Sequence, residues 1–349
     1  MKRVLIALGI LVVAGAAVVL WAMVRGGTFR TVEAHFDGRC TAIGGIAGAE
    51  DIVVDHKAKR AWISADDRRA RMAGEDVRGR LVSYDLSSPA AQPKDATPDL
   101  PYDFHPHGLS LWQGADGAER LFVINHQSFG GHRIEVFDVA DGRLSYAGGI
   151  VLPELRSPNA IVAVGENQFY VANDHGSATA TGRWLEQTFA LPRADVVYFD
   201  GARATIVAEG LRFPSGIEVS ADGTRLWVGE ATGGAVRVYG RDVASGLLRE
   251  ETRIALDTAP DNLRRDDSGT IWTAAHPKLG ALLAHFGDAA ALSPTQVIRF
   301  GEENGAIRAE EILLDGGETL SAGSVAAVSG RRLLIGAIMD PRFLDCTLP

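Results

Sequence analysis

One pattern recurs six times along this chain: a turn, followed by a short β-rich run that ends in small or polar residues. Each copy also follows another short apolar run, so paired strands recur at spacings of roughly 45–60 residues, close to the ~40–50 residues of one four-stranded propeller blade. The pattern predicts an all-β fold, a six-bladed β-propeller. A pair of β-sandwiches is the alternative, but it would not require six regular repeats. The copies are residues 56–64, 115–123, 165–171, 221–228, 267–273 and 329–335.

The first 26 residues differ in character from the rest. A Lys-Arg pair precedes an uncharged run from Val4 to Val24, about the ~20 residues that a membrane-spanning helix needs. A cleavable signal peptide has a shorter apolar core, roughly 7–15 residues, and Trp21-Ala22-Met23 is a poor cleavage site. We therefore expect an uncleaved N-terminal transmembrane helix within residues 1–26 and a propeller domain over residues 27–349. The basic pair favours a cytoplasmic N-terminus, which places the propeller on the periplasmic or extracellular side.

The net charge of the chain is −9. Because nucleic-acid binding requires a basic face that neutralises phosphates, no nucleic-acid partner is expected. An acidic balance is compatible with a cation site and with a neutral small-molecule substrate.

The only two cysteines, Cys40 and Cys346, lie near the two ends of the predicted ring of blades. A ring must be held closed between its first and last blades, and a disulfide here would close a loop of about 300 residues, worth ~4–5 kcal/mol by the chain-entropy estimate. A location outside the cytoplasm permits such a bond. The alternative is a pair of unrelated buried thiols, and we expect the disulfide.

Residues just before the innermost strands of a propeller converge at one face of its channel, however far apart they are in sequence. Four of these six positions offer a carboxylate, an amide or an imidazole, and the other two offer a serine hydroxyl. Oxygen ligands of this kind suit calcium, which takes ~6–8 of them, and the absence of Cys/His clusters argues against zinc. The alternative is that Asp and Asn merely end turns before strands. The residues are Glu50 and Asp51, His107, Asn159, Ser215, Asp261 and Asn262, and Ser324.

Two histidines bracket one hairpin of the second blade, His107 and His126, so they are expected side by side near the channel mouth. A histidine pair can share a proton, and one member can act as a general base on a water molecule. His107 is the better candidate because it starts an inner strand. For any other single histidine, the default interpretation is a structural hydrogen bond.

At these residues the sequence resembles the paraoxonases, a family of calcium-dependent arylesterases and lactonases with a six-bladed propeller fold. The resemblance covers roughly residues 38–348. The segments that carry it are 48–51, 105–110, 123–126, 158–165, 169–175, 207–210, 261–262, 275–277 and 333–336, with the terminal Cys346.

The resemblance implies a role for each matching residue. The catalytic calcium would be held by Glu50, Asn159, Asp261 and Asn262. His107 and His126 would form a histidine dyad, His276 would be a further channel histidine, and Cys40 and Cys346 would form the ring-closing disulfide. We also expect Ser324 to line the substrate channel.

The chain departs from the family at two metal positions. The family usually has Asn where this chain has Ser215, so one calcium ligand is shorter. The family's second, structural calcium uses Asp51 and an Asp at the position of Ala160, whose carboxylate is missing here. We predict one firm calcium site and at most a weak second site at Asp51 and Leu109.

The predicted function is calcium-dependent hydrolysis of an aryl ester or a lactone, with a metal-polarised carbonyl and a water activated by His107 and His126. No Gly-x-Ser-x-Gly elbow suggests a serine nucleophile, and Glu50 could act as ligand, base or both. One alternative is a sugar lactonase or a strictosidine-synthase-like propeller. The other is a non-catalytic binding propeller, because a fold alone does not fix a function.

Overall fold

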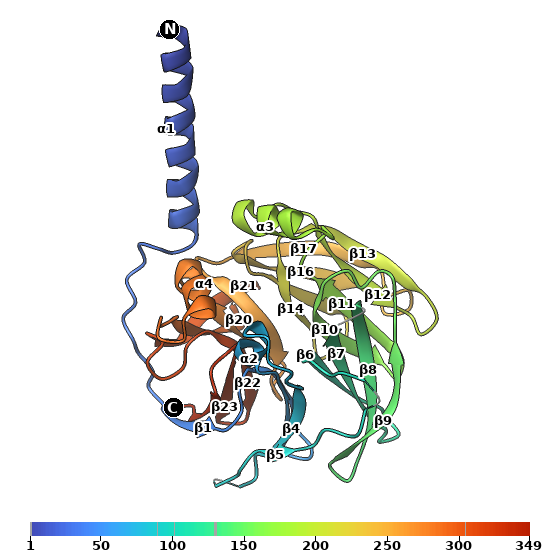
Figure 1. Ribbon diagram of the computed structural model, residues 1–349. Helices are drawn as coiled ribbons and strands as arrows, with labels where there is room; N and C mark the ends of the chain where they lie inside the picture. The colour runs from blue at the N-terminus through green and yellow to red at the C-terminus, as the bar shows by residue number, and fades with distance from the viewer. Residues whose placement is uncertain (1, 89, 101, 129–130, 304) are drawn as a thin grey trace.

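Six four-stranded antiparallel sheets follow one another along the described part of the chain and stand as blades around a common axis (Figure 1). The computed structural model describes residues 2–88, 90–100, 102–128, 131–303 and 305–349. The fold is therefore the predicted six-bladed propeller. In five blades the strands pair in chain order, as expected when consecutive strands are joined by short hairpins, and the sixth takes its outer strand from the start of the chain.

The first three blades use the strands nearest the N-terminus. Blade 1 comprises β2 (Ala49–Asp55), β3 (Arg60–Ala65), β4 (Arg80–Asp85) and β5 (Lys94–Asp95). Blade 2 comprises β6 (Pro106–Gln113), β7 (Glu119–Gln127), β8 (Gly131–Ala140) and β9 (Arg143–Ile150). Blade 3 comprises β10 (Pro158–Gly165), β11 (Gln168–Asn173), β12 (Ala194–Phe199) and β13 (Ala204–Leu211).

The remaining blades follow the same order until the ring closes. Blade 4 comprises β14 (Pro214–Val219), β15 (Arg225–Glu230), β16 (Ala235–Arg241) and β17 (Leu248–Ala255). Blade 5 comprises β18 (Ala259–Arg265), β19 (Ile271–His276), β20 (Thr295–Glu303) and β21 (Ala306–Asp315). Blade 6 comprises β22 (Gly323–Ser329), β23 (Arg332–Ala337), β24 (Arg342–Thr347) and, from the start of the chain, β1 (Arg39–Gly44).

The six sequence repeats correspond to the second strands of the blades, β3, β7, β11, β15, β19 and β23. The apolar run before each repeat forms the first strand, and the first strands of neighbouring blades contact one another around the ring. First and second strands are buried along most of their length because blades cover both of their faces, which explains their nearly continuous apolar runs.

The hydrophobic core lies between adjacent blades. Between blades 1 and 2, Trp62 packs in one buried cluster with Phe104, Leu109 and Phe137. Burial of a large apolar side chain contributes roughly 1.5–3 kcal/mol, so each interface fixes the relative position of two neighbouring inner strands.

Blade 6 is completed by the two ends of the chain. Strand β1 pairs with β24, and in that register Cys40 lies opposite Cys346. The two cysteines form a disulfide, as predicted. Because β1 leads directly into β2, this pairing joins blade 6 to blade 1 and closes the ring.

Four helices are found in the described residues: α1 (Lys2–Arg25), α2 (Arg68–Met72), α3 (Ala180–Phe189) and α4 (Leu279–Gly287). Helix α1 extends away from the propeller (Figure 1), and the chain just after it contacts the start of α4, where the Leu279 N–H donates to the Gly26 carbonyl oxygen at 2.9 Å. Among the residues that the structure describes, no helix meets the length and apolarity needed to cross a membrane. The predicted transmembrane helix is therefore not supported by the structure.

Candidate active site and metal-binding residues

The innermost strand of every blade in the described chain is irregular at its start. The ladder between first and second strands skips one or two residues there, as in a β-bulge. A bulged residue loses its ladder partner, and its side chain is re-aimed. The skipped residues are Glu50, His107 with Gly108, Asn159, Ser215, Asp261 with Asn262, and Ser324.

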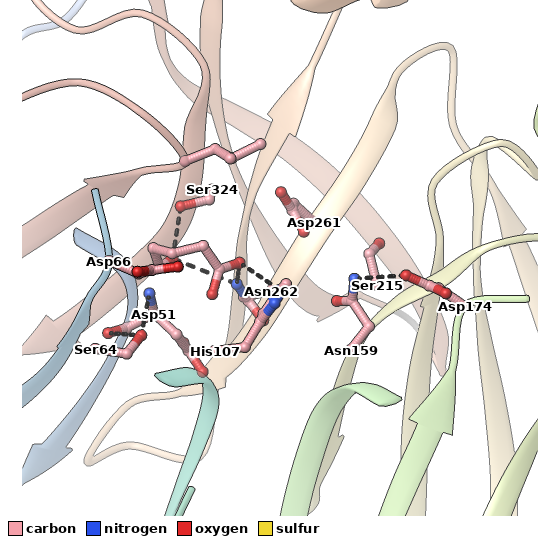
Figure 2. A network of polar contacts seen from close by, with 12 residues as sticks. Asp51, Ser64, Asp66, His107, Asn159, Asp174, Ser215, Asp261, Asn262 and Ser324 are labelled. Carbon is pink, nitrogen blue, oxygen red and sulfur yellow. Dashed lines mark hydrogen bonds and ion pairs between the residues drawn. The ribbon is translucent and has the colours of Figure 1, made fainter. Parts of the chain in front are cut away.

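Apart from Asp51, which keeps its ladder partner Ser64, the strand-start positions identified from the sequence are all bulged. Figure 2 shows the side chains of His107, Asn159, Ser215, Asp261, Asn262 and Ser324 gathered in one region. Two glycines, Gly108 and Gly216, allow the innermost strands of neighbouring blades to pack closely against each other. A Cβ atom on Gly108 would lie 2.6 Å from the carbonyl oxygen of Asn159, and one on Gly216 would lie 2.3 Å from that of Asp261. The glycines therefore keep His107 beside Asn159 and Ser215 beside Asp261.

Glu50 lies at the centre of the cluster and is only 2% exposed. Its Oε1 atom accepts a hydrogen bond from Asn262 Nδ2 at 2.8 Å and lies 3.4 Å from His107 Nε2. Burial raises the pKa of Glu50, but the neighbouring His107 ring, Arg68 and the Asn262 amide outweigh burial and hold the pKa at about 2. Glu50 is therefore a carboxylate at neutral pH.

The predicted channel residue Ser324 supports Glu50 instead of lining the channel. Its side chain is fully buried, and its hydroxyl donates to the backbone carbonyl oxygen of Glu50 at 2.6 Å. The hydroxyl of Ser215 likewise donates to the Pro260 carbonyl oxygen at 2.9 Å.

On the opposite side of the cluster, Asp174 orients the amide of Asn159 (Figure 2). Asn159 Nδ2 donates to Asp174 Oδ2 at 3.1 Å, so the amide oxygen faces away from this carboxylate. Burial raises the pKa of Asp174, but hydrogen bonds from His175, Ser157 and Asn159 lower it further than burial raises it. The sequence placed Asp174 in the family resemblance without assigning it a role.

Asp261 and His276 form a buried pair. His276 Nε2 lies 3.0 Å from Asp261 Oδ2, and burial raises the pKa of Asp261 above its usual range. His276 also borders a cavity of about 610 Å³ beside the end of α1, which Trp21 and Leu279 help to line. His276 thus connects the site to this cavity.

Three buried oxygens of the cluster have no hydrogen-bond partner: Glu50 Oε2, Asn159 Oδ1 and Asn262 Oδ1. Buried polar atoms are normally paired, and an unpaired oxygen costs about 1–3 kcal/mol. A hard cation with oxygen ligands would satisfy all three, and Asp261 adds a second carboxylate. The residues therefore fit calcium. In the described residues no group of three or more His, Cys, Asp and Glu could hold a metal, so such a site depends on the two amide oxygens.

The second predicted metal position does not fit an ion. Arg264, buried and directed to the same place, donates to Asp51 Oδ2 and, at 2.9 Å, to the carbonyl oxygen of Leu109. Its Nε atom donates to the Ile52 carbonyl oxygen at 2.9 Å. The guanidinium thus satisfies the two groups that were predicted to bind a second calcium. Sequence reasoning missed Arg264 because an arginine inside a strand gives no metal-site pattern.

His107 and His126 lie side by side, as predicted. His107 Nδ1 is 3.0 Å from His126 Nε2, and the rings meet edge to face with centroids 4.9 Å apart. A third ring, His132, follows on the far side of His126, with 2.8 Å between their Nδ1 atoms. The sequence analysis missed His132. The pairing of β7 with β8 places it opposite His126, and only that register could have indicated it.

Known proteins resemble the chain over most of its length. A sequence profile described as Arylesterase matches residues 76–348. Serum paraoxonase/arylesterase 2 of Homo sapiens is 29% identical over 332 residues, which cover 91% of this chain and 91% of that protein. Serum paraoxonase/arylesterase 1 of Mus musculus is 30% identical over 253 residues, 70% of this chain and 69% of that protein.

Solved structures share the fold at lower identity. A gluconolactonase from Xanthomonas campestris gives a TM-score of 0.56 at 16% identity and covers 90% of both chains. The calcium-binding protein regucalcin from Agrobacterium tumefaciens gives a TM-score of 0.52 at 15% identity, over 90% of this chain and 96% of that one. At these identities the likeness shows the propeller fold alone.

Proposed function

This chain belongs to the paraoxonase and arylesterase family, and on that premise we propose that it hydrolyses aryl esters and lactones with calcium as its cofactor. The chain is a carboxylic ester hydrolase of the propeller type. The proposed calcium ligands are Glu50, Asn159, Asp261 and Asn262, with Ser215 as a weaker contributor.

The observation that carries the calcium proposal is the set of unpaired oxygens on Glu50, Asn159 and Asn262. They come from three different blades and lie in one buried cluster beside the histidine pair. A protein that only needed a stable channel could fill it with apolar side chains at lower cost. Unpaired oxygens beside a candidate base are instead typical of a site that binds a cation and polarises a substrate.

The side chains divide the chemistry between them. A calcium ion, when bound, polarises the substrate carbonyl and stabilises the negative charge that develops on its oxygen. His107 Nε2, 3.4 Å from Glu50 Oε1, takes a proton from the attacking water as the water oxygen bonds to the carbonyl carbon. The ester C–O bond then breaks, and the protonated His107 returns the proton to the leaving oxygen. A lactone opens to its hydroxy acid in this way.

The test uses the full-length chain in detergent, with phenyl acetate and a γ-lactone as substrates. We expect hydrolysis with calcium, loss of activity with EGTA and recovery when calcium is restored. His107→Gln should lower kcat by about 100-fold, the lower end of general-base contributions, with nearly unchanged calcium affinity. His35→Gln is the control because that histidine is half exposed and remote from the cluster. Folded, calcium-binding protein that hydrolyses neither substrate would contradict the proposal.

We also propose that the N-terminal segment, residues 1–26, anchors the enzyme in a membrane with the propeller, residues 27–349, outside the cytoplasm. The uncharged run from Val4 to Val24 and the Lys-Arg pair before it support this orientation, and the disulfide suits an oxidising compartment. Carbonate extraction tests attachment, and protease added to intact cells or spheroplasts tests the side. Release by carbonate, or full protection from protease, would contradict the proposal.

A further inference from the structure

A second group of polar side chains lies where blades 1 and 2 meet, with hydrogen bonds separate from those of the candidate metal site. Asp66 directly follows β3, His105 directly precedes β6, and Ser128 directly follows β7. The end of β7 pairs with the start of β6, and the end of β3 pairs with the start of β2. All three residues therefore lie at the face of the ring where the innermost strands begin.

Hydrogen bonds join the three side chains in a row. His105 Nδ1 lies 3.0 Å from Asp66 Oδ1, and His105 Nε2 lies 3.1 Å from the hydroxyl oxygen of Ser128. A carboxylate can only accept a hydrogen bond, so in the neutral ring the proton is on Nδ1 and the lone pair of Nε2 faces the hydroxyl. A carboxylate, an imidazole and a serine in this order allow the ring to take the hydroxyl proton.

The surroundings of each group suit this transfer. The side chains of His105 and Asp66 are only 4% and 1% exposed, whereas Ser128 is exposed. Arg71 Nη2 lies 3.0 Å from the second oxygen of Asp66 and pairs with its charge. The His105 N–H donates to Asn125 Oδ1 at 2.8 Å, which fixes the backbone of the histidine. A buried and oriented base thus faces a hydroxyl that solvent can reach.

A further carboxylate, Asp103, limits what this hydroxyl can do. Its Oδ2 atom lies 3.7 Å from His105 Nε2, where its charge stabilises the imidazolium that forms when the ring takes a proton. The same oxygen accepts the backbone N–H of Ser128 at 2.7 Å. Backbone N–H groups at the nucleophile commonly stabilise the oxyanion in fast serine hydrolases, and this one is occupied. We therefore expect a nucleophile for activated substrates with slow turnover.

We propose that Asp66, His105 and Ser128 form a second reactive site, independent of calcium, at which activated esters acylate Ser128. Ser128 Oγ bonds to the carbonyl carbon while His105 Nε2 takes the hydroxyl proton. The bond to the leaving oxygen then breaks, and His105 gives that oxygen the proton, so that a phenol or alcohol departs and an acyl-serine remains. Because a phenol leaves more readily than a serine hydroxyl, the acyl-serine is hydrolysed slowly and accumulates.

The first test uses the full-length chain in detergent with EGTA, which removes calcium. A fluorophosphonate labels an activated serine by forming an Oγ–P bond and releasing fluoride, and trypsin then yields residues 121–133, whose only serine is Ser128. We expect the added mass on this peptide by mass spectrometry. Asp66→Asn should slow labelling by about 100-fold or more, because the base is no longer oriented.

Two variants control this labelling. Ser128→Ala should leave the peptide unlabelled, whereas Ser145→Ala, which changes an exposed serine of the same blade, should label like the wild type. An unlabelled peptide in folded wild type, a label that persists in Ser128→Ala, or equally fast labelling of Asp66→Asn would overturn the proposal.

Phenyl acetate provides a second readout under the same conditions. We expect release of about one phenol per chain, after which release nearly stops, together with an acetyl group on the peptide of residues 121–133. Ser128→Ala should abolish both signals. No release from the wild type, or the same release from Ser128→Ala, would contradict acylation at Ser128.

A cysteine variant keeps the site testable if Asp66→Asn does not fold. Both natural cysteines form the disulfide, so Ser128→Cys introduces the only free thiol. A neighbouring histidine stabilises the reactive thiolate, and iodoacetamide should alkylate Ser128→Cys about 10-fold faster than Ser145→Cys at pH 7. Equal rates would overturn the proposal. If the wild type hydrolyses neither substrate with calcium but is labelled at Ser128, the proposed function fails and the second site stands.

Discussion

The guanidinium of Arg264 lies against the carboxylate of Asp51, and both groups are buried. Arg264 belongs to the innermost strand of blade 5, and Asp51 belongs to the innermost strand of blade 1. Arg264 also donates a hydrogen bond to the carbonyl oxygen of Leu109, which belongs to the innermost strand of blade 2. One side chain thus links three blades across the channel. A bound cation could provide the same cross-link, but the positive charge here is covalently part of the chain.

We therefore predict that the wild-type enzyme binds one calcium ion per chain with high affinity. Equilibrium dialysis followed by metal analysis measures this ratio. Chelation should abolish activity and leave the propeller folded, because the charge that holds blades 1, 2 and 5 together remains. Two ions bound with comparable affinity would contradict the assignment of Arg264.

Arg264→Met removes the charge but keeps most of the length of the side chain. Breaking a buried ion pair by removing one partner costs about 3–5 kcal/mol, so the free energy of unfolding should fall by about that amount in urea titrations. The double variant with Asp51→Asn is the control, because it removes both charges. Its loss should be smaller than the sum of the two single losses, and an additive result would show that the groups do not interact.

Asn159→Leu should weaken calcium binding. Leucine has a similar size but lacks the oxygen that is unpaired in the structure, and we expect at least about a 10-fold higher calcium Kd, or about 1.4 kcal/mol. Asn167→Leu is the matched control because Asn167 is exposed in the same blade. Calcium titration by calorimetry measures both variants. Equal affinities for the two would remove Asn159 from the metal site.

The fold was predictable from the sequence because each blade is marked by a pattern of neighbouring residues. Each hairpin repeats a turn followed by an apolar strand, and the ring geometry then brings residues such as Glu50, Asn159 and Asp261 together without any further long-range information. The disulfide between Cys40 and Cys346 followed from the same geometry. The β-bulges explain why positions at the strand starts carry the site, although the sequence pattern alone did not show them.

The directions of individual side chains were not predictable. Ser324 occupies a strand start like the others, but its hydroxyl turns to the Glu50 backbone. Arg264 reaches from one blade to two others, and His132 depends on the register of β7 and β8. Each of these contacts joins residues from different strands, and it forms only when the packing and register of those strands are fixed. A repeating pattern of apolar and polar residues in one sequence does not specify such side-chain contacts.

Removing the disulfide should destabilise the ring without affecting the metal site. The bond joins residues 306 apart, and closing a loop of that length is worth about 5 kcal/mol in the chain-entropy estimate. Cys40→Ser with Cys346→Ser should lower the free energy of unfolding by up to about this amount, with little change in calcium affinity. Wild type treated with reductant should approach the same stability. An unchanged unfolding midpoint in the double variant would contradict a closing role for the bond.

Acid should destabilise the enzyme through His126. Its pKa in the folded state is well below the usual value because the ring is buried, whereas in the unfolded chain it takes up a proton near pH 6.5. The stability from its neutral form is therefore present above about pH 6.5 and is lost as the pH falls toward the folded pKa, by up to about 1.4 kcal/mol per pH unit.

His126→Gln lacks this titration, so its free energy of unfolding should fall less steeply between pH 7.5 and 5.5 than that of the wild type. Urea titrations at several pH values measure the slope, and His35→Gln should keep the wild-type slope because that side chain is half exposed. Other groups with a lowered pKa, such as Asp174, contribute equally to all three proteins and cancel in the comparison. Parallel slopes for wild type and His126→Gln would mean that the pKa of His126 is the same in the folded and the unfolded protein, which would contradict the lowering by burial.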